Sequence, residues 1–465
     1  MSIRLSSPFR RIRSNSFSSY RDTSKLTRLR IFLFHTSAGR VVIGTFIIWI
    51  LAAAFCRHAF WRDPHSWFFD GKSAFKPGYT GYRREESRAF IAAADDPTTN
   101  VDVFKPQSNN EPVICASLVT VNRVTDEQYL SDTIGSLLAG LTTEERSAVN
   151  VRLLFANSSD VGPQAGHPDY NATWLRSIDS WGPYNVTEKQ LELLEEYQHN
   201  NTYRKKWAFD YAYALEDCYN HTNAPYIAKI EDDTIFADGW LPKALDALAQ
   251  ARERQAVWLY LRLFYTEYLR GWDGDVDGWY ANPVFVFVFA MVACLLAAVA
   301  VRRARQTWRP QMGSEAINLM NVLMWICIPA LVVLLFMIGI DSLSPRHHGV
   351  VRMDAKGCCT QALVYPRHQV PHLVAALRER KPAPTDWMIE EWADELHLAR
   401  YAVVPPLAQH VGLKSSAGMT KKYTRLTWAY EFEAQNAKIL RKDHRKRGRG
   451  AIWRAEDDRP VVMPS

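Results

Sequence analysis

Two long apolar runs in the middle of the chain constrain its fold more than any other feature. They extend over Pro283–Val301 and Ile317–Ile340, and a bilayer-crossing helix needs roughly 17–25 such residues. The short segment between them, 302–316, carries four arginines. The pair therefore predicts a membrane hairpin inserted between two soluble parts. A buried helical hairpin in a soluble core is the alternative, and the length of the runs disfavours it.

A third apolar run, Val41–Phe55, lies near the N-terminus. The first 40 residues hold nine lysines and arginines against a single acid, Asp22. Because Lys and Arg concentrate on the cytosolic side of membrane segments, the N-terminus is predicted to be cytosolic. No small-residue cleavage site follows the run, which favours an uncleaved signal anchor. Three spans then place both soluble parts in the lumen of the secretory pathway.

The predicted division of the chain follows from these spans. Its segments are a cytosolic basic tail (1–40), a transmembrane signal anchor (41–57), a luminal stem of limited order (58–110), a first domain part (111–282), a second span (283–301), a cytosolic loop (302–316), a third span (317–340), a second domain part (341–420) and a basic luminal tail (421–465). The last segment is expected to be solvated or disordered, because a run of like charges repels itself.

Glycosylation sequons agree with a luminal first domain part. Five Asn-x-Ser/Thr sequons fall within it, at Asn157, Asn171, Asn185, Asn200 and Asn220, and such sequons accept glycans in secreted segments. The net charge of +7 comes from the two ends of the chain. The mildly acidic middle has no basic surface of the kind that binds nucleic acid.

The cysteines divide between the spans and the lumen. Cys115, Cys218, Cys358 and Cys359 are predicted to be luminal, where disulfides form. Four cysteines allow three connectivities, and the spacing does not choose among them. The neighbours Cys358 and Cys359 are expected not to bond to each other, because the resulting ring is small and strained.

The first soluble part alternates between strand and helix patterns. Apolar runs typical of buried strands lie at 113–121, 151–155 and 226–230, and helical patterns lie at 128–138, 188–198 and 203–219. This alternation is typical of a doubly wound α/β sheet. Ligands of such sheets bind beyond the carboxyl ends of the strands.

An acidic triplet, Glu231-Asp232-Asp233, directly follows the strand at 226–230. Adjacent carboxylates repel one another, so a fold that holds them together usually supplies a cation. Carboxylate oxygens suit Mg²⁺ or Mn²⁺. Arg123 and Asp160 follow neighbouring strands and are expected at the same sheet edge. An acidic turn in water is the alternative interpretation.

The chain resembles a known family at four stretches. They are Ile230–Asp233, Leu263–Trp272, Gly357–Ala362 and Val404–Gly412. The family comprises the Golgi N-acetylgalactosaminyltransferases that add a side chain to the GPI-anchor glycan, which are related to the enzymes that branch N-glycans with N-acetylglucosamine. The resemblance covers residues 111–420. It implies a GT-A-type, Rossmann-like domain split by a tandem transmembrane pair.

The resemblance also implies a chemistry. A UDP-sugar would be the donor, Mn²⁺ or Mg²⁺ the metal, and the transfer would invert the anomeric centre. Asp233 would be the most direct metal ligand, together with Glu231 and His410, and Asp232 would lie nearer the ribose. Arg123, Lys206 and Asp210 are placed at the donor, although a solvated helix face explains the last two almost equally well.

Inversion requires a carboxylate that takes the proton of the acceptor hydroxyl. Asp386 is the candidate base, with Glu390 and Glu391 one helical turn further on. A role as helix N-cap explains Asp386 equally well. Tyr265, Trp272 and Gln361 are the candidate substrate contacts, and aromatic residues so close to a span also serve as membrane-interface anchors.

The expected function is therefore transfer of a hexosamine, N-acetylgalactosamine first among them, to the mannose core of GPI anchors at the Golgi membrane or in the endoplasmic reticulum. The expected partners are the UDP-sugar, GPI-anchored proteins or the GPI glycolipid, and membrane lipids. Two alternatives stay open: transfer of another sugar to N-glycans or other glycolipids, and a non-catalytic membrane adaptor that keeps the fold.

Overall fold

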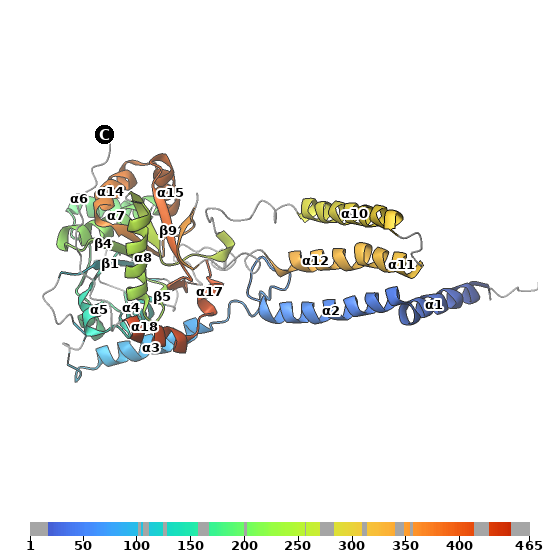
Figure 1. The fold of residues 1–465 in the computed structure, drawn as a ribbon. Helices are drawn as coiled ribbons and strands as arrows, with labels where there is room; N and C mark the ends of the chain where they lie inside the picture. The colour runs from blue at the N-terminus through green and yellow to red at the C-terminus, as the bar shows by residue number, and fades with distance from the viewer. Residues whose placement is uncertain are drawn as a thin grey trace, which may run out of the picture. The chain divides into compact units, whose positions relative to one another are not determined.

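The structure is a computed structural model that divides the chain into two compact units (Figure 1). It describes residues 17–100, 104–105, 111–123, 128–156, 167–199, 202–255, 257–269, 283–308, 314–339, 348–353, 357–412 and 427–447. The helical unit comprises Met1–Trp61, His65–Phe69 and Val276–Leu343. The globular unit comprises Arg62–Pro64, Asp70–Asp275 and Ser344–Ser465.

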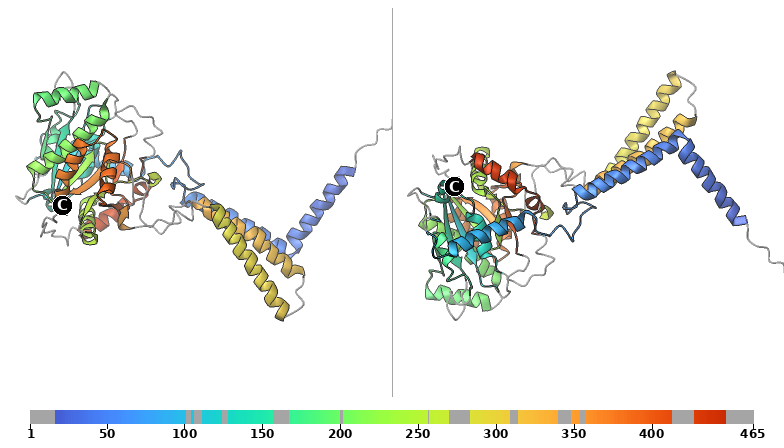
Figure 2. Two further views of the ribbon diagram at one scale, coloured as in Figure 1. Left: turned by 90° about the horizontal axis from the view of Figure 1, so that it is seen from above. Right: turned by 90° about the horizontal axis from the view of Figure 1, so that it is seen from below.

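The helical unit contains the three predicted spans. Its helices are α1 (Phe17–His35), α2 (Ser37–Ala59), α10 (Pro283–Trp308), α11 (Ser314–Val322) and α12 (Ile328–Ile338), with a π-helical turn at Leu323–Cys327 between the last two. Both α2 and α10 contact α12 (Figures 1 and 2). The Trp49 indole donates to the Ala330 carbonyl at 2.9 Å. Among the described residues, Ser37–Ala59 and Asn318–Ile338 are long and apolar enough to cross a membrane.

One eight-stranded sheet forms the centre of the globular unit. Its strands are β1 (Ile114–Thr120), β2 (Val149–Phe155), β3 (Ser180–Gly182), β4 (Tyr226–Glu231), β6 (Trp258–Arg262), β7 (Gly349–Met353), β8 (Ala362–Pro366) and β9 (Ala399–Val404), in the order β3-β2-β1-β4-β8-β6-β9-β7. The first four strands in this order, from β3 to β4, are parallel to one another, whereas β8 is antiparallel to both β4 and β6. The predicted α/β class is confirmed, and the sheet is mixed rather than wholly parallel.

The membrane segment interrupts this sheet instead of separating two domains. Strand β8 comes from the second soluble part and lies between β4 and β6, which both come from the first. Strand β9, again from the second part, pairs in parallel with β6. Both soluble parts therefore belong to one folded body.

Helices cover both faces of the sheet. They are α4 (Leu130–Leu138), α5 (Thr143–Ser147), α6 (Glu188–His199), α7 (Tyr203–His221), α8 (Trp240–Arg254), α14 (Val370–Glu379) and α15 (Thr385–Glu395), with single 3₁₀ turns at Thr173–Ser177, Glu267–Leu269 and Arg367–Gln369. Ile114 and Leu118 pack in the core that includes α4 and α8, and Cys115 packs in the core that includes α7. Successive strand residues face opposite sides of the sheet, so β1 is buried on both of its faces. This is why its sequence is a continuous apolar run.

Two segments are more ordered than the sequence indicated. The expected stem contains α3 (Tyr79–Asp95), and the expected tail contains α17 (Tyr430–Glu433) and α18 (Ala437–Arg447). Arg83 of α3 is 1% exposed, and it donates to the Phe236 and Ser136 carbonyls at 2.8 Å and pairs with Asp238 at 3.2 Å. A charged side chain can be buried when all of its hydrogen-bond donors have partners. The number of charges in a segment does not show whether such partners exist.

The disulfides select one of the three possible connectivities. Cys115 bonds to Cys218, which joins β1 to α7, and Cys358 bonds to Cys359. The expectation that the two neighbours stay unbonded is therefore wrong. Cys359 has a φ of 81°, in the left-handed region, and Arg262 donates to the carbonyls of both cysteines. The surrounding structure thus holds the turn that brings the two side chains together.

Removal of the Cys115–Cys218 bond should destabilise the globular unit. The bond closes a chain segment with a sequence separation of 103, and loops of this length contribute about 2–5 kcal/mol. We expect Cys218→Ser to lower the free energy of unfolding by about 4 kcal/mol in denaturant titrations. Cys56→Ser, which removes a free thiol, is the matched control. Equal stability of the two variants would contradict this assignment.

Candidate active site at the end of strand β4

The acidic triplet lies at the carboxyl end of β4, where Glu231 is the last strand residue. The chain then turns into β5 (Thr234–Phe236), which pairs with β10 (Ala408–His410) and places His410 opposite Thr234. As a result, His410 Nε2 lies 3.4 Å from Asp233 Oδ2. One ligand atom each of Glu231, Asp233 and His410 lies within 4.8 Å of the other two. Residues from both soluble parts therefore meet here.

A buried arginine balances the acids. Arg123 follows β1, donates to Asp232, and lies 3.1 Å from Asp233 Oδ2. Arg123, Asp232, Asp233 and His410 are all buried. Although burial alone would raise it, the pKa of Asp233 is held well below its usual value by His410 and Arg123. Burial opposes ionisation of His410, yet the neighbouring Asp233 raises the pKa of its imidazole.

The residues present fit a divalent cation. Asp233 Oδ1 is buried and has no hydrogen-bond partner among the described residues, and a buried carboxylate oxygen without a partner is costly. Two carboxylates and one imidazole supply oxygen and nitrogen ligands, a combination that Mn²⁺ and other first-row divalent ions accept. A cation held by Glu231, Asp233 and His410 would complete the coordination of that oxygen.

Threonine hydroxyls fix the acids in place. Thr120 donates to Asp232 Oδ2 at 2.7 Å, Thr133 donates to the Asp232 carbonyl at 2.6 Å, and Thr360 donates to Glu231 Oε1 at 2.6 Å. The sequence analysis missed all three, because a single hydroxyl leaves no periodicity or motif. The position of Thr120 as the last residue of β1 was the one available signal.

The comparison with protein families identifies the chain's relatives. Residues 114–409, from the first residue of β1 to β10, match the model of the GPI-N-acetylgalactosamine transferase PGAP4. The chain belongs to this family. The resemblance found in the sequence is thereby confirmed, and the PGAP4 family is one of glycosyltransferases. No curated protein sequence matches the chain significantly.

Within this PGAP4-family site, the predicted donor residues Lys206 and Asp210 make a separate cluster. Lys206 Nζ donates to the Ala156 carbonyl at 2.7 Å, to the Tyr184 hydroxyl at 2.9 Å and to Asp210 at 2.8 Å. An ammonium has three N–H donors, so these contacts use all of them. The pair joins α7 to the end of β2, and the contact of Lys206 and Asp210 with the donor stays a prediction.

The three candidate bases have different environments. Glu390 is buried and accepts from Tyr260 at 2.5 Å, Arg262 at 3.2 Å and Arg400 at 2.8 Å. Because its carboxylate already binds these three groups, Glu390 is less available to take a proton than Asp386, and its role as a base stays a prediction. Glu391 is an exposed residue 4.0 Å from Arg380.

Asp386 is the candidate that lies beside the loop at the site. Pro384, not Asp386, is the N-cap of α15. Asp386 Oδ2 accepts from the Cys359 backbone N–H at 3.1 Å. This contact ties the carboxylate to the loop of the Cys358–Cys359 disulfide, and the next residue, Thr360, binds Glu231.

The predicted substrate contacts also differ from one another. Tyr265 is 2% exposed and donates to Glu431, so little of its ring is open to a sugar, and its contact with the substrate stays a prediction. The Gln361 carbonyl accepts from the Glu231 N–H at 2.9 Å, and its buried side-chain oxygen has no hydrogen-bond partner among the described residues. Trp272 and Asp160 lie outside the described residues.

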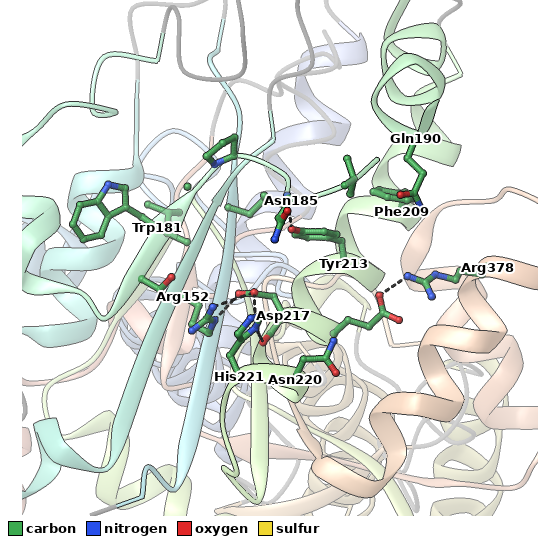
Figure 3. A pocket seen from close by; sticks show the side chains of 17 residues that line it. Arg152, Trp181, Asn185, Gln190, Phe209, Tyr213, Asp217, Asn220, His221 and Arg378 are labelled. Atoms are coloured by element: carbon green, nitrogen blue, oxygen red, sulfur yellow. Dashed lines mark hydrogen bonds and ion pairs between the residues drawn. The ribbon is translucent and has the colours of Figure 1, made fainter. Parts of the chain in front are cut away.

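A pocket of about 490 Å³ lies beside β2, β3 and α7 (Figure 3). Arg152 and Asp217 form an ion pair at 2.5 Å within it, and two sequon residues, Asn185 and Asn220, line it. Both asparagines are exposed, as is Asn171, and all three are therefore accessible to glycans. The lining of this pocket contains none of the candidate site residues, so the pocket is not the predicted donor site.

His167, which the sequence analysis also missed, makes the stability of the site pH-dependent. Its Nδ1 accepts from the Asp169 N–H at 3.2 Å, so Nε2 carries the proton and donates to Thr120 at 3.1 Å. Burial, together with the Arg123 charge, lowers the pKa of His167 from 6.5 to about 4. The unfolded chain therefore binds more protons between these two values, and stability is lost as the pH falls through them.

We expect the free energy of unfolding to fall by about 2 kcal/mol from His167 alone between pH 7 and pH 5. His167→Gln keeps a donor for Thr120 but does not titrate, so this part of the pH dependence should disappear. Denaturant titrations of the two proteins at both pH values measure the difference. An unchanged pH dependence in the variant would contradict the prediction.

Proposed function

We propose that this chain transfers N-acetylgalactosamine from UDP-N-acetylgalactosamine to the mannose core of GPI anchors, with inversion, at the Golgi membrane. The observation that carries the proposal is the cluster of Glu231, Asp233 and His410 at the end of β4 in a member of the GPI-N-acetylgalactosamine transferase family. Carboxylates at this sheet edge suit the metal-bound diphosphate of a nucleotide-sugar.

The proposed donor site uses the charges already described. Glu231, Asp233 and His410 would hold Mn²⁺ or Mg²⁺, which when bound neutralises charge on a departing diphosphate. Arg123 stabilises negative charge on Asp232 and Asp233 through its hydrogen bonds to both. Asp232 is fixed from a second side by Thr120. It is the carboxylate that we assign to the ribose side of the nucleotide.

Asp386 is the proposed base. The acceptor hydroxyl oxygen forms a bond to the anomeric carbon while the bond from that carbon to the UDP oxygen breaks, and Asp386 takes the hydroxyl proton. A base must lie within hydrogen-bond reach of that proton. Asp386 is half-buried and held by the Cys359 N–H, which supports this role better than the paired Glu390 or the exposed Glu391.

The membrane helices support an acceptor that is itself lipid-linked. Two described helices are apolar enough to span a bilayer, and α10 contains the second predicted span, 283–301. We propose the three-pass topology with a luminal globular unit, in which the sheet carrying the acids and the GPI glycan are on the same side of the membrane. The exposed sequons agree with that side.

The test uses the full-length protein purified in detergent. We expect Mn²⁺-dependent transfer of labelled sugar from UDP-N-acetylgalactosamine to a GPI glycan, and little transfer from UDP-galactose or UDP-N-acetylglucosamine. Preferred use of another donor or of an N-glycan acceptor would replace the proposed substrates. Neither transfer nor UDP binding would favour the adaptor alternative. In cells that lack the protein, a full complement of side-chain hexosamine on GPI glycans would refute the proposed acceptor.

A further inference from the structure

Residues beyond the family match reach the candidate metal ligands. The match ends at Gln409, one residue before His410. The segment 427–433, here called the C-terminal clasp, contains α17 and contacts β10 directly. It contacts Gln409 and His410, the last two residues of that strand.

The clasp binds the side chains of Gln409 and His410. Thr427 Oγ1 lies 2.8 Å from His410 Nδ1. The Gln409 amide oxygen accepts from the Ala429 N–H at 2.9 Å, and its amide nitrogen donates to the Ala429 carbonyl at 2.9 Å. Two reciprocal bonds at Gln409 therefore fix the position of Thr427 relative to the neighbouring imidazole.

Two buried carboxylates anchor the clasp to the rest of the globular unit. Glu267 accepts from the N–H groups of Tyr430 and Glu431 at 2.8 and 2.7 Å. Glu433 accepts from the Gly78 N–H at 2.6 Å and from the Gln409 amide at 2.9 Å. Phe432, the residue before Glu433, is also fully buried. The clasp is thus a packed part of the core, connected to the start of α3 as well as to β10.

We propose that the C-terminal clasp positions His410 for metal binding, with Thr427 as the positioning residue. This inference rests on the proposed function, in which His410 Nε2 is a ligand. If Nε2 binds a metal, the ring proton is on Nδ1 and donates to Thr427 Oγ1, so this hydrogen bond fixes the orientation of the ring and directs Nε2 toward Asp233. Loss of such a partner typically costs 10–100-fold in metal affinity.

The experiment measures Mn²⁺ binding to the full-length protein by calorimetry, without substrate. Thr427→Val removes the hydroxyl at nearly constant volume, and we expect a 10–100-fold weaker affinity. Thr427→Ser restores the hydroxyl and should bind within about threefold of the wild type, by the same reasoning. Thr266→Val is the matched control. Thr266 donates to the Trp428 carbonyl at 3.2 Å, so this variant loses a clasp contact but none to His410.

The outcomes separate this inference from the proposed function. A wild-type protein that does not bind Mn²⁺ would overturn the metal role in the proposed function. A wild type that binds while Thr427→Val binds equally well would overturn the clasp inference alone. Equal losses in Thr427→Val and Thr266→Val would also overturn the specific role of Thr427. Should Thr427→Val fail to fold, Thr427→Ala replaces it, and equal Mn²⁺ affinities of Thr427→Ala and Thr427→Ser would overturn the inference.

Discussion

Replacement of Asp233 by asparagine should lower transfer from UDP-N-acetylgalactosamine at least about a thousand-fold, the equivalent of about 4 kcal/mol of transition-state stabilisation. Asparagine keeps the shape of the side chain but loses the negative charge. Asp233 Oδ1 is the buried oxygen without a hydrogen-bond partner among the described residues, and Oδ2 faces Arg123 and His410. The variant should therefore lose its metal affinity together with its activity.

The same change also leaves the buried Arg123 without part of its counter-charge, which destabilises the folded state. Thermal unfolding of the variant must accordingly be measured beside its kinetics. Asp217→Asn is the matched control, since Asp217 also pairs with an arginine, Arg152, but in the pocket beside β3. We expect this control to keep most of its activity. More than a tenth of wild-type activity in folded Asp233→Asn would refute the proposed metal role of Asp233.

Gly412→Ala should be nearly as damaging, although it adds only one methyl group. A β-carbon at this position would overlap Asp233 Oδ2 and lie 2.9 Å from His410 Nε2. Separations below 3.0 Å force atoms to move, and the atoms concerned are two of the proposed ligands. We expect at least a hundred-fold loss of transfer and a tenfold weaker Mn²⁺ affinity, because ligands must be held close to their productive geometry.

Gly182→Ala provides the control for this prediction. Gly182 is the last residue of β3, and a β-carbon there would meet no atom within 4 Å. Kinetics and Mn²⁺ calorimetry of the two variants should therefore differ sharply. If Gly412→Ala binds Mn²⁺ as the wild type does, the two proposed ligands are not as close in solution as they are in the structure.

Much of the fold could be predicted from the sequence because β1 and β4 are buried on both faces, and β2 ends in the buried apolar run Leu153–Phe155. The direction of a strand leaves no such pattern, so the antiparallel pairing of β8 was not predicted. The order of α3 was missed for a different reason. Its Arg83 is buried through specific carbonyl and carboxylate partners, and those partners lie far away in the sequence.

The candidate site shows the same limit. The proximity of Glu231, Asp233 and His410 was expected from the family resemblance, since 177 residues separate Asp233 from His410 in the chain. Residue type alone did not distinguish the proposed base from a carboxylate that is buried and paired. Glu390 carries the same group as Asp386, yet Tyr260, Arg262 and Arg400 surround it, and the first two lie far from it in the sequence.

The interleaved strand order has a consequence for biosynthesis. Until β8 has been translated, β4 and β6 each expose an unpaired edge, and exposed edges favour aggregation. The ribosome reaches β8 only after both helices of the hairpin, α10 and α11–α12, have been made. Completion of the sheet must therefore follow synthesis of the hairpin. We therefore expect nascent chains that stop before β8 to aggregate, and no catalytic turnover can precede the closure of the sheet by this strand.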